Sequence, residues 1–227
     1  MRQTSLNIIA IGIFVVTMSS LFGPIFNVSP FYIAIATFSV LVLATIDTLG
    51  WQGQGSMLIV DLVAGTSSER RDRIICHEAG HFLAAYLLEI PISGYALSAW
   101  EAFRQGQSAQ GGVRFDDQNL TDQLHKGVIS NQLVDRYCTV WMAGIAAENL
   151  VYGNAEGGAE DRTKITAILR QLKRPGESKL KQSWASLQAR SLLDNHQSAY
   201  EALVKAMKER ASVSNCYQVI KQHLSVN

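Results

Sequence analysis

Two nearly unbroken apolar runs occupy the first fifty residues, about Leu6 to Phe26 and about Phe31 to Gly50. Each run is close to the ~20 residues that an α-helix needs to cross the hydrocarbon core of a membrane. The short turn between them ends at Pro30, a residue that suits the first turn of a helix. A soluble core hairpin would show polar residues on one face, and a cleaved signal peptide would not be followed by a second full-length span. The pattern predicts a transmembrane hairpin.

Charged residues are almost absent from this region, because Arg2 and Asp47 are the only ones before position 60. The turn between the two spans carries no Lys or Arg, whereas Arg2 precedes the first span and three arginines lie about twenty residues beyond the second. This distribution predicts that both termini and the following domain lie on the cytoplasmic side, or on the stromal side of an organelle. The segment Ser56 to Val63 is too short to span, and we expect it along the membrane surface.

Polar and apolar positions then alternate with helical spacing over "GTSSERRDRIICHEAGHFLAAYLLEIP". Thr66 and Glu69 have the spacing of a capping box, and Pro91 ends the segment, so the pattern predicts one helix. Apolar residues cover much of its circumference, which indicates a buried helix. Gly80, a poor helix former, indicates close backbone packing against a neighbouring element.

His77, Glu78 and His81 form the H-E-x-x-H arrangement of zinc hydrolases. Residues four apart lie one turn apart on the same helix face, so both imidazoles can bind one ion. Glu78 points about 100° away, which suits a base for the attacking water better than a third ligand. Two buried structural histidines are the alternative, but burying three ionisable groups without a metal is costly.

A catalytic zinc site needs a third protein ligand. Glu101 lies twenty residues after His81, a spacing that some zinc proteases use. However, the segment Ile92 to Gly106 reads as extended, and with "GGVRF" it predicts a small β-hairpin instead of a second ligand helix. Further on, the pattern predicts a long helix to about Tyr152, a glycine-rich turn, and a helix that begins near Asp161.

The combination of "HEAGHFLAAYLL" with "AGIAAENLVYG" and "GGAEDRTKIT" resembles the protease domain of the FtsH family, membrane-anchored ATP-dependent zinc metalloproteases. The resemblance covers roughly Arg70 to Gln171. It implies that His77 and His81 bind Zn²⁺, that Glu78 is the catalytic glutamate, and that Asp161 is the third ligand. An ungapped alignment would place Arg162 there instead, but arginine cannot bind zinc at ordinary pH. Glu148 is either a hydrogen-bond partner of a zinc histidine or part of a surface salt bridge.

The sequence departs from the family because it contains no G-x-x-x-x-G-K-[ST] phosphate loop and has no room for an ATPase domain between spans and protease. The chain therefore resembles the short, motor-less FtsH-like proteins of cyanobacteria and plastids. After about position 172 the family pattern fades, and apolar residues at helical spacing predict helices that pack on the protease domain.

Composition limits the remaining alternatives. The net charge is +1 and no basic cluster is present, so we expect no nucleic acid partner. The three cysteines (Cys76, Cys138 and Cys216) form no C-x-x-C pair, which fits a reducing compartment and argues against a disulfide framework or a cysteine zinc site.

We therefore expect a mainly α protein with a transmembrane hairpin (1–55), an FtsH-like zinc protease domain with a small β-hairpin (56–171), and a C-terminal helical extension (172–227). Its expected activity is hydrolysis of peptide bonds through a zinc-activated water, without an ATPase of its own. The alternative is a non-proteolytic membrane adaptor that associates with an ATPase-bearing FtsH. Expected partners are a protein or peptide substrate, the lipid membrane, and a full-length FtsH-type ATPase or further copies of this chain. The expected location is a cyanobacterial-type or plastid-related membrane.

Overall fold

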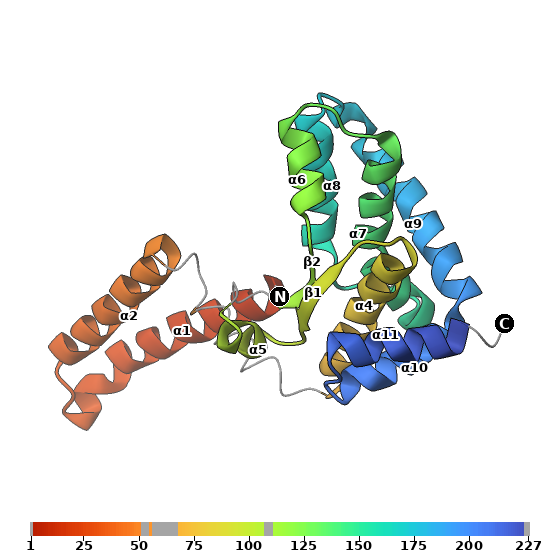
Figure 1. Ribbon diagram of the computed structural model, residues 1–227. Coiled ribbons are helices and arrows are strands. Elements are labelled where there is room, and N and C mark those ends of the chain that lie inside the picture. Colours follow the sequence, from red (N-terminus) through yellow and green to blue (C-terminus); the bar gives the residue numbers. More distant parts are fainter. Residues whose placement is uncertain (1, 51–54, 56–67, 107–110, 225–227) are drawn as a thin grey trace. The chain divides into compact units, whose positions relative to one another are not determined.

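The computed structural model describes residues 2–50, 55, 68–106 and 111–224 (Figure 1). In chain order its elements are α1 (Arg2–Phe22), a 3₁₀ turn (Gly23–Phe26), α2 (Pro30–Gly50), α4 (Ser68–Leu87), β1 (Ile92–Ala96), α5 (Ala99–Arg104), β2 (Gly112–Phe115), α6 (Gln118–His125), α7 (Asn131–Tyr152), α8 (Ala159–Gln171), a 3₁₀ turn (Pro175–Glu177), α9 (Ser178–Asn195), α10 (Gln197–Lys208) and α11 (Val213–Leu224). The fold is mainly helical with one small antiparallel sheet, as the sequence predicts.

The chain divides into two compact units. The first comprises Met1–Ser68 and Ser98–Gly111, and the second comprises Glu69–Leu97 and Gly112–Asn227. The H-E-x-x-H motif and all of the C-terminal helices belong to the second unit. The three-part division at positions 55 and 171 stays a prediction.

In the first unit, α1 and α2 are long and apolar enough to cross a membrane, over Leu6–Phe26 and Pro30–Gly50. Their apolar side chains are mostly exposed, unlike those of a helix in the core of a soluble protein. The hydroxyl groups of Thr17, Thr37, Thr45 and Thr48 each donate to the carbonyl four residues earlier, at 2.8 Å. These bonds satisfy the four threonine hydroxyls within their own helices, where lipid would offer them no partner. The segment Ser56 to Val63 lies outside the described residues.

The second unit is built around α4, whose apolar residues pack into one continuous core. The described helix begins at Ser68, and the predicted capping residue Thr66 lies outside the described residues. As expected, Gly80 marks a close approach: a Cβ atom there would lie 2.5 Å from the carbonyl oxygen of Ala143 on α7. Any side chain at this position would therefore force α4 and α7 apart.

The predicted β-hairpin is present, with β1 and β2 antiparallel and Ala96 opposite Gly112. The expectation of an extended segment as far as Gly106 is wrong, because the chain forms helix α5 after Ala96. The Ser98 hydroxyl oxygen accepts the Glu101 amide at 3.1 Å and so caps this helix. The two aromatic residues of "AWEAFR" are three positions apart, which is a helical spacing. The partial alternation of polar and apolar residues in the longer segment instead favoured an extended chain.

Helices α9–α11 contribute residues to the core of the second unit. Three tyrosine hydroxyls also fasten them to α4 and β1. Tyr200 donates to the Cys76 carbonyl at 2.9 Å, Tyr95 donates to the Ala211 carbonyl at 2.5 Å, and the Ile92 amide donates to Tyr217 at 3.1 Å. The C-terminal helices therefore help to position both the motif helix and the hairpin. All three cysteines are buried and free, as expected.

Candidate metal centre

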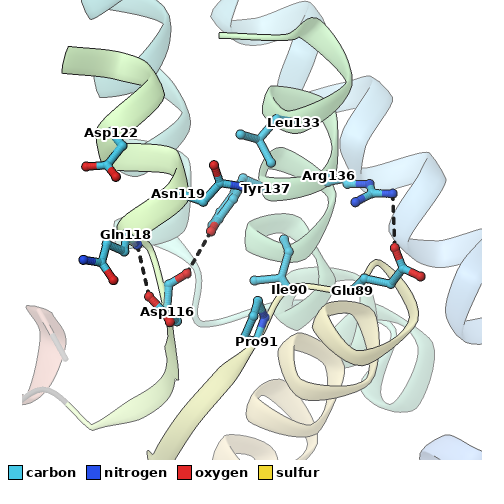
Figure 2. Close-up of a pocket in the computed structure, with 10 residues that line it drawn as sticks. All are labelled: Glu89, Ile90, Pro91, Asp116, Gln118, Asn119, Asp122, Leu133, Arg136 and Tyr137. Atoms are coloured by element: carbon cyan, nitrogen blue, oxygen red, sulfur yellow. Dashed lines mark hydrogen bonds and ion pairs between the residues drawn. The ribbon is translucent and has the colours of Figure 1, made fainter. Parts of the chain in front are cut away.

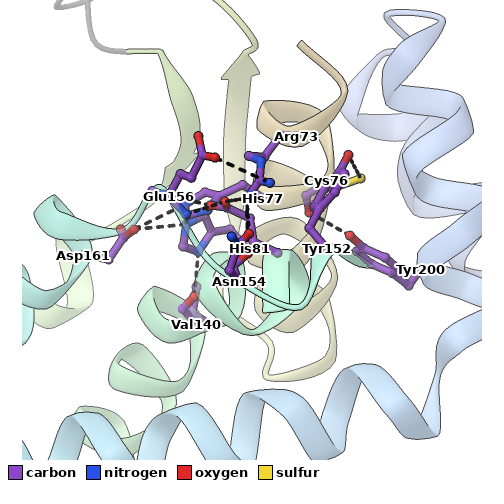
Figure 3. Close-up of polar contacts among 12 residues, drawn as sticks. Arg73, Cys76, His77, His81, Val140, Tyr152, Asn154, Glu156, Asp161 and Tyr200 are labelled. Carbon is purple, nitrogen blue, oxygen red and sulfur yellow. Dashed lines mark hydrogen bonds and ion pairs between the residues drawn. The ribbon is translucent and has the colours of Figure 1, made fainter. Parts of the chain in front are cut away.

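Two helices of the second unit, α4 and α8, bring His77, His81 and Asp161 together (Figure 3). The two imidazoles project from adjacent turns of α4, and Asp161 lies in the first turn of α8. The two Nε2 atoms are 3.0 Å apart, and Asp161 Oδ2 lies 3.4 Å from His77 Nε2 and 3.5 Å from His81 Nε2. All three side chains are buried, so the cluster is a preformed group inside the fold.

The opposite ring nitrogens donate hydrogen bonds to oxygen atoms on α7. His81 Nδ1 lies 2.7 Å from the Val140 carbonyl oxygen, and His77 Nδ1 lies 2.7 Å from Glu148 Oε1. A carbonyl or carboxylate oxygen only accepts, so both Nδ1 atoms carry the hydrogen. Both Nε2 lone pairs are therefore directed at the space that the two rings and Asp161 share. Glu148 is 2% exposed and also pairs with Arg73 at 3.1 Å, so it is a buried hydrogen-bond partner of His77, and its ion pair is not the surface salt bridge of the alternative interpretation.

Two lone pairs 3.0 Å apart repel each other unless a proton or a cation lies between them. Burial alone would lower the pKa of His77, but contacts with Asp161 and Glu148 outweigh burial and raise it to about 10. Burial would raise the pKa of Glu148, yet hydrogen bonds from His77 and from the Glu156 amide lower it to about 2. Burial would raise the pKa of Asp161, but its contacts with His81 and His77 outweigh burial and hold it far below its usual range. The cluster is thus organised to hold positive charge.

The geometry fits a zinc ion. Donor atoms about 2.0–2.1 Å from a tetrahedral zinc lie about 3.4 Å from one another. The observed separations of 3.0, 3.4 and 3.5 Å lie close to that value. Two imidazoles and one carboxylate are a ligand set that catalytic zinc uses, with the fourth position left for water or substrate. His77, His81 and Asp161 could therefore hold such an ion.

Gly144 on α7 keeps the space beside the imidazoles open. A Cβ atom at this position would collide with His77 Nε2 and would lie 2.6 Å from His81 Nε2. The glycine-rich turn before α8 has a similar role, since a Cβ at Gly157 would lie 2.7 Å from Glu148 Oε1. The sequence shows that these positions hold glycine, but it does not show which atoms lie against them.

Glu78 lies beside the cluster and is not one of the three grouped side chains. Its Oε2 atom accepts the backbone amide of Val113 on β2 at 2.8 Å. The hairpin therefore fixes the glutamate next to the two histidines. This position agrees with the expectation that Glu78, one residue after His77, points about 100° away from it around the helix axis. Sequence reasoning did not find this contact, because nothing in "GGVRF" indicates which carboxylate its amides face.

The other candidates lie elsewhere. Glu101 lies on α5 in the first unit and is not part of the cluster. Arg162 is exposed on α8, one residue beyond Asp161. Thr166, on the same helix, donates to the Arg162 carbonyl at 3.0 Å and bonds to the Ser178 hydroxyl at 2.8 Å.

A separate pocket of about 440 Å³ lies between the start of β1, the end of β2, and helices α6 and α7 (Figure 2). It is lined mainly by polar side chains, among them Asp116, Asn119 and Arg136, and one Arg136–Glu89 ion pair of 3.6 Å lies at its edge. None of the three clustered residues lines it. The candidate metal centre is thus a cluster between helices and not this pocket.

Comparison with known proteins finds partial similarity to zinc metalloproteases. The chain is 35% identical over 109 residues to the ATP-dependent zinc metalloprotease FtsH 1 of Methylacidiphilum infernorum. It is also 35% identical over 106 residues to the ATP-dependent zinc metalloprotease FtsH of Pseudomonas putida. These matches cover 47% and 46% of this chain but 16% of each relative, so the chain spans a small part of their length. No protein-family model matches. The similarity supports a distant relationship to FtsH metalloproteases.

Proposed function

We propose that the protein is a membrane-anchored zinc metallopeptidase in which His77, His81 and Asp161 hold Zn²⁺ and Glu78 is the catalytic base. One observation carries this proposal. The two Nε2 atoms and the Asp161 carboxylate have the separations of a zinc ligand set, and both Nδ1 atoms are held so that the lone pairs face inward.

A zinc ion bound there would lower the pKa of a water molecule and polarise a peptide carbonyl. The chain's own residues would do the rest. Glu78 would take a proton from the attacking water and return it to the leaving amine. The Val113 amide would hold the Glu78 carboxylate in place, and Glu148 would orient His77.

In this proposal, α1 and α2 anchor the protein in the membrane, and both termini and the second unit lie on the cytoplasmic or stromal side. The 227 residues contain no phosphate loop, so this chain by itself has no means to couple ATP hydrolysis to unfolding. Its proposed substrates are flexible segments, unfolded chains and the tails of membrane proteins. Folded substrates would require a motor-bearing partner, for which a full-length FtsH-type relative is the proposed candidate.

The test is hydrolysis of casein by the detergent-purified full chain, with zinc content measured on the same samples. We expect cleavage that a zinc chelator stops. Glu78→Gln should keep its zinc and lose activity by about 10²-fold or more, the range for removal of a general base. Glu201→Gln, on the exposed surface of α10, is the matched control and should cleave normally.

Equal activity in the Glu78→Gln variant would show that the base is misassigned. No cleavage by a wild-type protein that holds its zinc would contradict the peptidase proposal and favour a non-proteolytic adaptor.

A further inference from the structure

Helix α5 exposes its aromatic residues and buries its small ones. Trp100 and Phe103 are 56% and 49% exposed, whereas Ala99 and Ala102 are 8% and 0% exposed. The two aromatic rings stack with their centroids 6.0 Å apart and an interplanar angle of 25°. A surface helix of a soluble domain normally has the reverse arrangement, with its large apolar residues turned inward. The exposed Trp100–Phe103 pair is therefore a candidate contact surface.

The helix belongs to the same compact unit as the two apolar helices. Ser98–Gly111 groups with Met1–Ser68, although by sequence it lies within the β1–β2 connection of the second unit. The same unit thus contains α1, α2 and the aromatic pair. This grouping puts the pair in the unit whose two apolar helices are proposed to meet lipid, whereas the metal cluster belongs to the other unit.

The chemistry of α5 matches the membrane–water interface. Tryptophan is enriched at that interface, where its ring contacts the acyl boundary and its N–H remains hydrated. Arg104 follows Phe103 directly and is exposed, so its guanidinium is available to lipid phosphate groups. Ser98 caps the amide of Glu101, which reduces the polar backbone that a short interfacial helix would expose.

We propose that α5 lies in the bilayer interface, with Trp100 and Phe103 inserted among the lipid headgroups as an additional membrane contact beside α1 and α2. The proposal rests on the proposed membrane anchoring, but it does not depend on zinc or on peptidase activity. An unfolded protein segment is the competing occupant of this surface, and the test distinguishes the two.

The experiment places the full chain in phosphatidylcholine vesicles whose acyl chains carry bromine near the headgroup, and measures quenching of tryptophan fluorescence. Trp51→Phe serves as the background, because Trp51 directly follows the second apolar helix. In this background, Trp100→Phe should remove most of the quenched intensity. Trp184→Phe is the matched control, since Trp184 is 37% exposed but belongs to the second unit, and it should leave the quenched intensity unchanged.

A rescue variant guards against a local folding defect. Adding Phe103→Trp to the Trp100→Phe protein should restore the quenching, because position 103 lies on the same exposed face. Bromine near the acyl ends should quench less than bromine near the headgroup, as expected for an interfacial position.

Three results would overturn the proposal. If the vesicles retain the protein in alkaline carbonate but Trp100 is not quenched, this proposal alone fails. If casein shifts the Trp100 emission while brominated lipid does not quench it, the surface binds unfolded protein instead. If alkaline carbonate extracts the protein from the vesicles, the membrane anchoring fails as well, while the casein-hydrolysis test of the peptidase is unaffected.

Discussion

Arg73 connects several parts of the candidate site, although no sequence motif indicates these contacts. Arg73 lies one turn before His77 on α4. The Nη1 atom of Arg73 lies 3.1 Å from Glu148 Oε2, 3.0 Å from the side-chain oxygen of Asn154 and 3.2 Å from its backbone oxygen. Its guanidinium also lies 4.3 Å from the centre of the Tyr152 ring (Figure 3). Arg73 thus ties α4 to the loop 153–158, which leads to Asp161, and to the carboxylate that orients His77.

Replacing Arg73 should therefore weaken zinc binding without removing a ligand. We expect Arg73→Ala to reduce zinc affinity by about 10–100-fold, the range for loss of an outer partner of a metal ligand. Arg73→Lys should fall in between, because one ammonium group cannot replace the planar fork. Competition with a chromophoric chelator measures the affinity, and the exposed Arg71→Ala is the control. Wild-type affinity in Arg73→Ala would contradict this role.

Single residues were predictable where chemistry follows from spacing. His77 and His81 are four apart on one helix, which alone indicates that they face one point. Asp161 required the family resemblance, because the turn before it could also have placed Arg162 there. Arg73 and the Val140 carbonyl could not be found, since their contacts depend on how α4, α7 and the loop pack in three dimensions.

At the scale of elements, the contact of α4 with α7 both supports the fold and shapes the site. Two glycines define it, but they face different neighbours. A Cβ at Gly80 would meet backbone atoms of Ala143, whereas a Cβ at Gly144 would meet the Nε2 ends of both histidines. The first contact keeps the helices close, and the second keeps space for an ion.

The two glycines should therefore respond differently to the same substitution. Gly80→Ala should destabilise the fold by about 1–3 kcal/mol, because the backbone of α7 must shift. Gly144→Ala should also lower the thermal stability, because the methyl group would collide with the two buried imidazoles, but unlike Gly80→Ala it should lose zinc, because it displaces both Nε2 atoms. Thermal denaturation and zinc content measure the two effects. Equal zinc content in both variants would contradict this interpretation of Gly144.

Elements with a strong period were the most predictable. The two apolar helices, the motif helix and α7 all follow the pattern of their apolar residues. The short α5 was missed because six residues hold less than two helical turns, too few to distinguish a helical period from a strand period. The hairpin itself was found, but its contact with Glu78 was not, because it depends on tertiary packing.

At the scale of the whole molecule, the proposed division between a membrane anchor and a catalytic unit has consequences for substrates. Unfolding a stable domain requires about 5–15 kcal/mol of work. No phosphate loop is present in the 227 residues to supply that work from ATP. The proposed peptidase therefore depends on substrates that are already unfolded.

We expect the pure chain to cleave the unfolded variant of a reporter protein and to leave its stable folded form intact. ATP should change neither rate. Gel-based cleavage assays of both reporters, with and without ATP, test this directly. ATP-stimulated degradation of the folded reporter by the pure chain would contradict the account.

The central claim is that His77, His81 and Asp161 form a zinc site, and zinc content per purified chain tests it most directly. The wild-type protein should hold about one zinc ion per chain, and His81→Ala and Asp161→Ala should hold almost none. Glu101→Ala, the alternative third ligand, should keep its zinc, because Glu101 is not part of the cluster. Full zinc occupancy in Asp161→Ala together with loss of zinc in Glu101→Ala would contradict the account.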